Sequence, residues 1–472
     1  MSEIKTAATR EASFSERLLA LFLDYPAERI PQSAVRAVQL CMKDTIGVAL
    51  AGGAFGVGTS GLRVAAEAGG PAESTVWGGG FSASRVDAAL ANGMLAHALD
   101  FDDTHPAAIM HSSTVNIPVA LAIGEAIKAP ASEILSAAIL GYEVSARLGR
   151  LGAGPFQDHG FQSTAVLGVF ASTFIAARLL KVNASVARNA MGIAGSMASG
   201  LMEYLSDGTD VKQMHPGWAA QAGIRAVQLA RAGLSGPATV LEGRFGVFKA
   251  YARLDIDPEA VLSFDGTRFE VEEMAPKPYP ACLCVHPMVQ GTINLRARGV
   301  FDRLDMVEDI HCEVPQWYVD LVFEPSVQKV AARNAYEGRF SAQFCVARAA
   351  LDGKLGVKSF LPENITDPEV ARIAGKVSYR ARPFAEFPET FPALVRVRLT
   401  DGSVHEASVP HNLGSAKLPM GEAGVNAKFR DNVIFAISES SADRLDAAIK
   451  NMQPGKPTDG LWSALKEAKL RH

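Results

Sequence analysis

The spacing of hydrophobic residues divides the chain into a helical part and a mixed part. Before residue 265, apolar side chains recur at three- and four-residue intervals, which predicts a series of buried helices. The clearest of these cover residues 31–50, 118–128, 132–148, 163–180, 184–205 and 217–232. Farther along, four runs alternate between apolar and polar residues, which predicts β-strands. These runs cover residues 307–314, 376–382, 393–400 and 403–409.

Helical periodicity returns near the C-terminus, over residues 426–435 and 442–452. The pattern therefore predicts a mainly α protein, with a large all-helical domain and a smaller α+β lid domain between its two parts. We place the first part of the helical domain at residues 1–266, the lid at residues 267–411 and the helical return at residues 412–472. A chain of 472 residues exceeds what a single core usually organises, so its length also favours two domains.

Composition and charge narrow the classes of partner. The chain has 46 basic and 50 acidic residues, and its net charge of −4 favours neither a nucleic acid nor a membrane surface as partner. An anionic ligand would need a local basic pocket. The first 14 residues contain no apolar stretch typical of a secretory signal, and no uncharged apolar run is long enough for a membrane span. We therefore expect a cytoplasmic protein.

The five cysteines are odd in number and scattered, which fits free thiols in a reducing compartment. They are Cys41, Cys282, Cys284, Cys312 and Cys345. Two of them lie close to His286, but their spacing is not that of a zinc ribbon and no second ligand pair follows. We interpret the cysteines as packing residues and expect no metal site.

One stretch concentrates residues that can transfer protons. Residues 92–113 read NGMLAHALDFDDTHPAAIMHSS, with three histidines and three aspartates. If the apolar helix that leads into this stretch continues to Pro106, then His97, Asp100 and Thr104 share one face. A single aspartate here would be interpreted as a helix cap or a solvated charge. The whole cluster predicts a functional site, because so many buried ionisable groups are unfavourable unless they are paired or used.

This stretch resembles the signature of the MmgE/PrpD family, which includes 2-methylcitrate dehydratase, cis-aconitate decarboxylase and iminodisuccinate epimerase. Similar segments follow in the family's order: Gly141-Tyr142-Glu143, Gly160-Phe161-Gln162-Ser163-Thr164, Lys212-Gln213-Met214-His215-Pro216-Gly217 and Lys277-Pro278-Tyr279-Pro280. The resemblance implies a helical domain with an inserted lid, an active site in the cleft between them, and a homodimer. It also implies a small polycarboxylate as substrate.

The resemblance implies a role for each catalytic candidate. Asp100, Thr104 and His111 match the family's Asp, Thr and His. We expect His111 to be the general acid and base, with Asp100 orienting it or a proton on the substrate, and Thr104 helping to hold that geometry. Lys212 matches the lysine of the substrate cleft, and His286 matches a histidine on the lid side.

Three residues are candidates for substrate binding: Tyr142, Gln162 and Tyr318. Gln162 stands where family members usually have histidine, and glutamine forms hydrogen bonds but cannot transfer a proton at neutral pH. His159, three residues earlier, is a possible replacement for that histidine. The remaining histidines of these segments are expected to be structural. They are His97 in the core, His105 in its turn and His215 in its loop.

These residues predict chemistry at a carbon atom next to a carboxylate. Histidine is a suitable base near neutrality, and lysine can stabilise the negative charge that develops, so we expect no metal and no organic cofactor. The leading hypothesis is a lyase, either a decarboxylase or a dehydratase, that acts on a di- or tricarboxylate. Asp102 argues against a true 2-methylcitrate dehydratase, where an asparagine is expected. An epimerase of an iminodisuccinate-like acid and a catalytically silent carboxylate-binding protein remain as alternatives.

Overall fold

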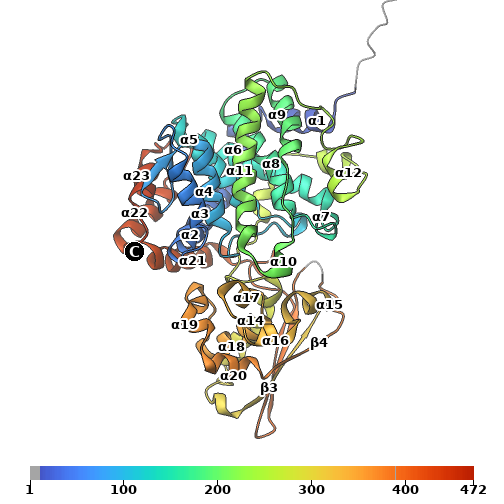
Figure 1. The fold of residues 1–472 in the computed structure, drawn as a ribbon, viewed down its shortest axis with the longest axis vertical. Helices are drawn as coiled ribbons and strands as arrows, with labels where there is room; N and C mark the ends of the chain where they lie inside the picture. The colour runs from blue at the N-terminus through green and yellow to red at the C-terminus, as the bar shows by residue number, and fades with distance from the viewer. Residues whose placement is uncertain (1–10, 388–389, 472) are drawn as a thin grey trace, which may run out of the picture.

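The computed structural model describes residues 11–387 and 390–471. It shows a mainly α protein in which a large helical part is joined to a smaller α+β domain (Figure 1). In the figure, the helical part runs from blue through green and includes the red C-terminal helices, whereas the lid is yellow to orange. The fold class predicted from the periodicity is therefore confirmed.

The helical part before the lid is built mainly from long helices. They are α1 (Phe14–Phe22), α2 (Gln32–Ala54), α3 (Thr59–Glu67), α4 (Arg85–His97), α5 (Ser113–Ala126), α6 (Ala131–Gly152), α8 (Ser163–Leu179), α9 (Ala184–Met197) and α11 (Met214–Arg231). Shorter helices are α7 (Pro155–Asp158), α10 (Tyr204–Asp207), α12 (Val247–Ala252) and α13 (Glu259–Leu262). α8 is buried on nearly every side, because α5, α6, α9 and α11 pack around it.

A short β-hairpin interrupts the helices, which the sequence analysis did not predict. Its strands β1 (Ser74–Val76) and β2 (Phe81–Ala83) pair antiparallel. Strands of three residues are too short to show a recognisable alternation, so only the glycine-rich turn between them is visible in the sequence.

The C-terminal helices return to the first part of the chain. They are α21 (Gly421–Ala436), α22 (Glu439–Lys450) and α23 (Asp459–Glu467). α21 packs against α2, where Phe429 lies over Gly47. From the same helix, the buried Lys428 pairs with Asp44 of α2 at 2.7 Å and donates to the Phe101 carbonyl at 2.6 Å. The helical core therefore contains side chains from both ends of the chain.

The lid is built on a four-stranded sheet in the order β4-β3-β5-β6. The strands are β3 (Val307–Val314), β4 (Val377–Ala381), β5 (Ala393–Leu399) and β6 (Val404–Val409), and only β3 and β4 pair in parallel. The larger lid helices are α14 (His286–Arg296), α18 (Ala342–Asp352) and α20 (Pro368–Ala374). Shorter ones are α15 (Gln316–Tyr318), α16 (Ser326–Val330), α17 (Ala335–Arg339) and α19 (Pro362–Ile365). α14 packs on β5 and β6, so the lid has its own hydrophobic core.

The cysteines and the lengths of the apolar helices can be compared with what the sequence predicts. All five cysteines are free and buried, as their interpretation as packing residues requires. Among the described residues, no single helix is long and apolar enough to cross a membrane, although the bent pair of α2 and α3 meets the criteria of length and composition together.

Two glycines determine how closely the elements of the site approach. Gly93 in α4 lies against Gly217 in α11, and a Cβ atom at Gly93 would come within 2.8 Å of the Gly217 Cα. Side chains do not tolerate such a distance, so glycine allows these two helices to pack in contact. The contact places the end of α4, at His97, close to Lys212, which precedes α11.

Candidate active site

The site begins where α4 ends. The helix stops at His97, and Asp100 has a φ of +51° in the left-handed region, which aspartate adopts more readily than most residues. The prediction that this helix continues to Pro106 is therefore wrong. Beyond the turn, Thr104 and Ala275 exchange two backbone hydrogen bonds, of 3.0 and 2.8 Å, and these hold the loop in an extended form.

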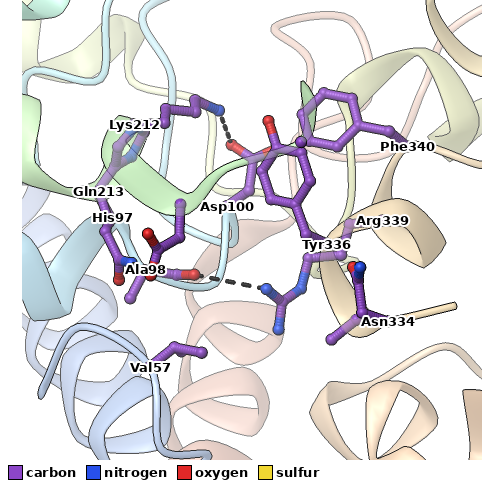
Figure 2. Close-up of a pocket in the computed structure, with 13 residues that line it drawn as sticks. Val57, His97, Ala98, Asp100, Lys212, Gln213, Asn334, Tyr336, Arg339 and Phe340 are labelled. Carbon is purple, nitrogen blue, oxygen red and sulfur yellow. Dashed lines mark hydrogen bonds and ion pairs between the residues drawn. The ribbon is translucent and has the colours of Figure 1, made fainter. Parts of the chain in front are cut away.

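A cavity of about 350 Å³ lies between the helical domain and the lid (Figure 2). Polar side chains reach it from both sides: His97, Asp100, Lys212 and Gln213 from the helical domain, and Asn334, Tyr336 and Arg339 from the lid. Its volume suits a small-molecule ligand. The three lid residues did not figure in the sequence analysis, because no quoted motif covers α17 or the residue before it.

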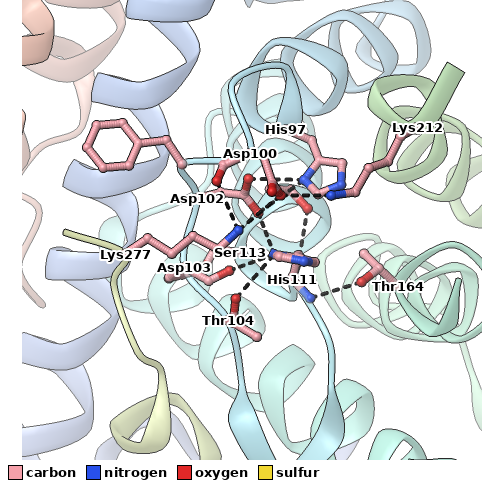
Figure 3. Close-up of polar contacts among 12 residues, drawn as sticks. His97, Asp100, Asp102, Asp103, Thr104, His111, Ser113, Thr164, Lys212 and Lys277 are labelled. Atoms are coloured by element: carbon pink, nitrogen blue, oxygen red, sulfur yellow. Dashed lines mark hydrogen bonds and ion pairs between the residues drawn. The ribbon is translucent and has the colours of Figure 1, made fainter. Parts of the chain in front are cut away.

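Asp102 lies between two histidines (Figure 3). Its two carboxylate oxygens contact His97 Nδ1 at 3.0 Å and His111 Nδ1 at 2.8 Å. The two rings have centroids 4.8 Å apart. The side chains of His97 and Asp102 are fully enclosed, whereas His111 keeps 15% of its side chain exposed. His111 is therefore the member of this group whose side chain keeps exposed surface, although His97, and not His111, is among the residues that line the cavity.

The surroundings of His111 fix which nitrogen carries the proton. Besides Asp102, its Nδ1 faces the Asp103 carbonyl at 3.1 Å and the Thr104 hydroxyl at 3.4 Å. Its backbone N–H donates to Thr164 Oγ1 at 2.9 Å, which anchors the residue. Since acceptors surround Nδ1, we assign the proton there, and this leaves Nε2 for proton transfer. The carboxylate that orients His111 is Asp102; the sequence analysis had expected Asp100.

The electrostatics of this group favour a neutral His97 beside a charged Asp102. Burial lowers the pKa of His97 to about 4, even though Asp102 opposes the shift. Burial also disfavours the Asp102 anion, but His97 and His111 outweigh it and hold the pKa of Asp102 well below its ordinary value. A fixed carboxylate in this position stabilises an imidazolium at His111.

Gln162 continues the hydrogen-bonded row behind His97. Its Oε1 accepts from His215 Nδ1 at 2.5 Å, and its Nε2 lies 3.2 Å from His97 Nε2. An amide nitrogen can only donate, so His97 Nε2 accepts and its Nδ1–H points to Asp102. Gln162 itself does not line the cavity, but it contacts His97, which does.

Two lysines converge on Asp100. Lys212 Nζ lies 2.7 Å from Asp100 Oδ1, and Lys277 Nζ lies 3.0 Å from the same oxygen and 2.9 Å from the Asp100 carbonyl. Burial opposes the charge of Asp100, but both lysines hold its pKa well below the ordinary range. Lys212 lines the cavity, whereas the buried Lys277 does not. Lys277 belongs to the family-like segment Lys277-Pro278-Tyr279-Pro280, for which no catalytic role was predicted.

Three candidates lie away from the cavity. The Tyr142 hydroxyl is buried and contacts Ser113 Oγ at 2.5 Å. Tyr318 is enclosed in the lid core, where it stacks on Phe391 with centroids 5.8 Å apart. His286 is also enclosed; its Nε2 lies 3.1 Å from a backbone carbonyl, and burial lowers its pKa to about 3. None of the three lines the cavity, so the structure does not bring them to the site described here.

Two other histidines have local partners. His105 accepts from the Ala108 N–H at 3.2 Å and lies 3.0 Å from Glu270, so it serves its turn as expected. His159 Nδ1 lies 2.8 Å from the Pro155 carbonyl and does not reach the cavity.

Asp103 lies in the helical core next to this row. Its Oδ2 accepts from Ser113 Oγ at 2.6 Å, and its Oδ1 has no hydrogen-bond partner among the described residues. Burial, together with the nearby Asp44 carboxylate, raises the pKa of Asp103 to about 8. The side chain is therefore a neutral acid at neutral pH.

We expect Asp103→Asn to remove part of the pH dependence of stability. Between the ordinary pKa of 3.8 and the folded value of about 8, the folded protein keeps a proton that the unfolded chain releases. The contribution of this proton to the stability of the fold is therefore complete below the ordinary pKa of 3.8, and it is lost as the pH rises through the folded pKa of about 8. The unfolding temperature of the variant should rise relative to wild type between about pH 5 and pH 8. Parallel curves for the two proteins would contradict this assignment.

The row also contains the atoms that a metal ion would need. His97, Asp102 and His111 offer ligand atoms that all lie within 4.8 Å of one another. Both Nδ1 atoms, however, already point at the Asp102 carboxylate. A metal ion would have to replace both hydrogen bonds, so the arrangement fits a pair of oriented imidazoles better than a metal centre.

The sequence is similar to those of known proteins over most of its length. The family model of the MmgE/PrpD N-terminal domain matches residues 16–258, and that of the C-terminal domain matches residues 279–453. Cis-aconitate decarboxylase from Homo sapiens is 29% identical over 414 residues, which cover 83% of this chain and 82% of the relative. The Mus musculus protein of the same name is 28% identical over 83% of this chain and 81% of its own. The Aspergillus terreus one is 26% identical over 80% of each.

Proposed function

Because the chain belongs to the MmgE/PrpD family, we propose that it is a lyase that removes a carboxyl group from a small tricarboxylate. The observation that carries the proposal is the His111–Asp102 contact of 2.8 Å beside a carboxylate that two lysines hold. The similarity to several cis-aconitate decarboxylases supports the substrate class.

The residues can perform each part of this reaction. Decarboxylation breaks one carbon–carbon bond, releases carbon dioxide and leaves the bonding electron pair on the carbon skeleton. The ammonium groups of Lys212 and Lys277 stabilise that negative charge. His111 in its protonated form delivers a proton to carbon through Nε2 and then regains one from solvent, while Asp102 stabilises the imidazolium. The step needs no oxidant and no reductant.

The number of available bases favours a lyase over an epimerase. Epimerisation removes a proton from one face of a carbon atom and returns it to the other, which calls for two acid–base groups. Gln162 cannot supply the second. Both ring nitrogens of His97 are engaged, by Asp102 and Gln162, and burial lowers the pKa of His97 and His215 to about 4, which makes both weak bases. His111 alone remains exposed in the row, and one proton donor is sufficient for a decarboxylase.

Product identity tests the proposal. Purified protein would be incubated with cis-aconitate, citrate, methylcitrate and iminodisuccinate, and the products would be identified by mass spectrometry. We expect cis-aconitate to lose the mass of carbon dioxide. Loss or gain of water instead would indicate a dehydratase, inversion without a change in mass an epimerase, and binding without any conversion a catalytically silent protein.

We expect Lys212→Met to lower kcat/KM by about tenfold to a hundredfold, because a charge-assisted hydrogen bond contributes about 1.5–3 kcal/mol. The variant keeps the length of the side chain and removes its charge. Lys249→Met is the matched control, since Lys249 is exposed and pairs with Asp255 away from the cavity. Steady-state kinetics on the true substrate provide the measurement. An unchanged kcat/KM for Lys212→Met would assign Lys212 a structural role.

A further inference from the structure

Arg339 is a buried cation for which the described residues provide no carboxylate partner. Only 3% of the residue is exposed, and its Nε and Nη2 have no hydrogen-bond partner in the described chain. Its one recorded hydrogen bond is long, 3.5 Å from Nη1 to the Ala98 carbonyl (Figure 2). The guanidinium lies 5.3 Å from the ring centre of Phe55 and 5.5 Å from that of Phe360. It is therefore held by rings from the helical domain and the lid.

Such a charge is unfavourable unless something pairs with it. Burial lowers the pKa of Arg339 to about 10, which reflects the cost of the charge in this position. Arg348, another buried arginine of the lid, is accommodated differently, because Asp352 and Asp367 both pair with it. Arg339 lines the cavity, so a ligand there can supply the missing anion.

Tyr336 provides a second unused donor in the same short helix. Its hydroxyl is buried without a hydrogen-bond partner among the described residues, and the side chain lines the same cavity. Tyr336 and Arg339 are three residues apart in α17, so they lie on one face. Figure 2 shows both beside Asp100, with Lys212 on the opposite side.

We propose that Arg339 and Tyr336 form a carboxylate-binding subsite on the lid, which takes a second carboxylate of a substrate whose reacting end lies near Lys212. The proposal rests on the function proposed above and narrows its substrate class. The planar fork of a guanidinium matches a carboxylate with two parallel hydrogen bonds, and the tyrosine hydroxyl adds a third. A ligand that spans from Lys212 to Arg339 needs at least two carboxylates, so monocarboxylates are excluded as good substrates.

The test measures binding of an unreactive probe, propane-1,2,3-tricarboxylate, to the full-length protein by calorimetry. We expect Arg339→Gln to weaken binding by about tenfold to a hundredfold, and Tyr336→Phe to weaken it by a few-fold. Arg333→Gln is the matched control, because Arg333 is exposed on the lid and pairs with Glu337. Butyrate and inorganic phosphate should bind much more weakly than the probe, because neither can span from Lys212 to Arg339.

Stability of the free protein separates a binding role from a structural one. If Arg339 awaits a ligand, then neutral glutamine removes an unpaired buried charge, and the unfolding temperature of free Arg339→Gln should equal or exceed that of wild type. If that variant fails to fold, Arg339→Lys keeps the charge, loses the fork and should still bind the probe more weakly. Equal probe affinity in wild type and a folded Arg339 variant would overturn the proposal. The proposal would also be overturned if the wild type failed to bind the probe, or if it bound inorganic phosphate as tightly as the probe.

The probe undergoes no reaction, so this result does not depend on the proposed activity. Binding that requires Arg339 in a protein that does not convert cis-aconitate would leave the subsite in place and refute the lyase. If the protein converts cis-aconitate but Arg339→Gln leaves the probe affinity unchanged, then the subsite would be refuted and the lyase would stand.

Discussion

Replacing His111 with alanine should lower kcat by about 10²–10⁴-fold while the substrate still binds, because this is the usual contribution of a general acid or base. The Nδ1 atom of His111 is held by Asp102 at 2.8 Å, and His111 is the one ring of the row that keeps exposed surface. Lys212 and Arg339, which we expect to bind the carboxylates, are untouched by this change. Steady-state kinetics together with a separate measurement of substrate affinity will distinguish loss of chemistry from loss of binding.

The matched control for this variant is His159→Ala. Among the described residues, the one recorded hydrogen-bond partner of the His159 ring is the Pro155 carbonyl, and His159 does not line the cavity. The control variant should keep nearly normal kcat. If His111→Ala retains turnover while His159→Ala or His286→Ala abolishes it, then the proton is transferred by a different histidine.

Asp102→Asn should be as damaging as the loss of His111, with kcat reduced by about 10²–10⁴-fold. Asparagine offers one oxygen and one amide nitrogen to the two Nδ1 atoms that now face a carboxylate. If the amide nitrogen faces His111, its Nδ1 becomes an acceptor and Nε2 carries the proton. Either way, the imidazolium loses the anion that stabilises it.

Asp103→Asn is the control for that experiment, because it makes the same chemical change at the next residue. The Asp103 side chain is already neutral at neutral pH and faces Ser113 in the core, so its variant should keep most of its turnover. The difference in kcat between Asp102→Asn and Asp103→Asn is measured from the pH–rate profiles of the two variants. Equal activity of the two variants would show that Asp102 does not orient the reacting histidine.

The sequence predicted those elements that depend on residues close together along the chain. Period-two alternation predicted β3, β4, β5 and β6, and the Asp401-Gly402 turn between the last two has Gly402 at a φ of +85°. The same kind of local reasoning misjudged the end of α4. Proline at position 106 is a strong helix terminator, but the helix already ends at His97. Asp100 follows in the left-handed region, where two lysines from distant segments pair with it.

The partners in the site could not be predicted from spacing, because they meet through space. The family resemblance favoured Asp100 as a partner of His111, whereas the turn after His97 presents Asp102 instead. The contact between Gln162 and His97 joins residues 65 positions apart. Arg339 is one of many arginines in the sequence, and only the cavity and its unused nitrogens distinguish it.

Tyr142 and Tyr318 illustrate the opposite error. Both were proposed as hydroxyl groups that bind substrate, and only Tyr142 belongs to a quoted family-like segment. Both rings are fully buried, and large aromatic side chains more often fill a core than contact a ligand. Tyr142 reaches Asp103 only through Ser113. Burial is a property of the whole fold, so the sequence alone did not separate these tyrosines from Tyr336, which lines the cavity.

The most direct test of the account follows the carbon-bound proton itself. Purified protein would be incubated with cis-aconitate in deuterium oxide, and the products would be identified by NMR and mass spectrometry. We predict a product that has lost one carboxyl group and carries one carbon-bound deuterium, formed much more slowly by His111→Ala. Unconsumed cis-aconitate, together with deuterium exchange into a dicarboxylate that keeps all its carbon atoms, would contradict the lyase that we propose.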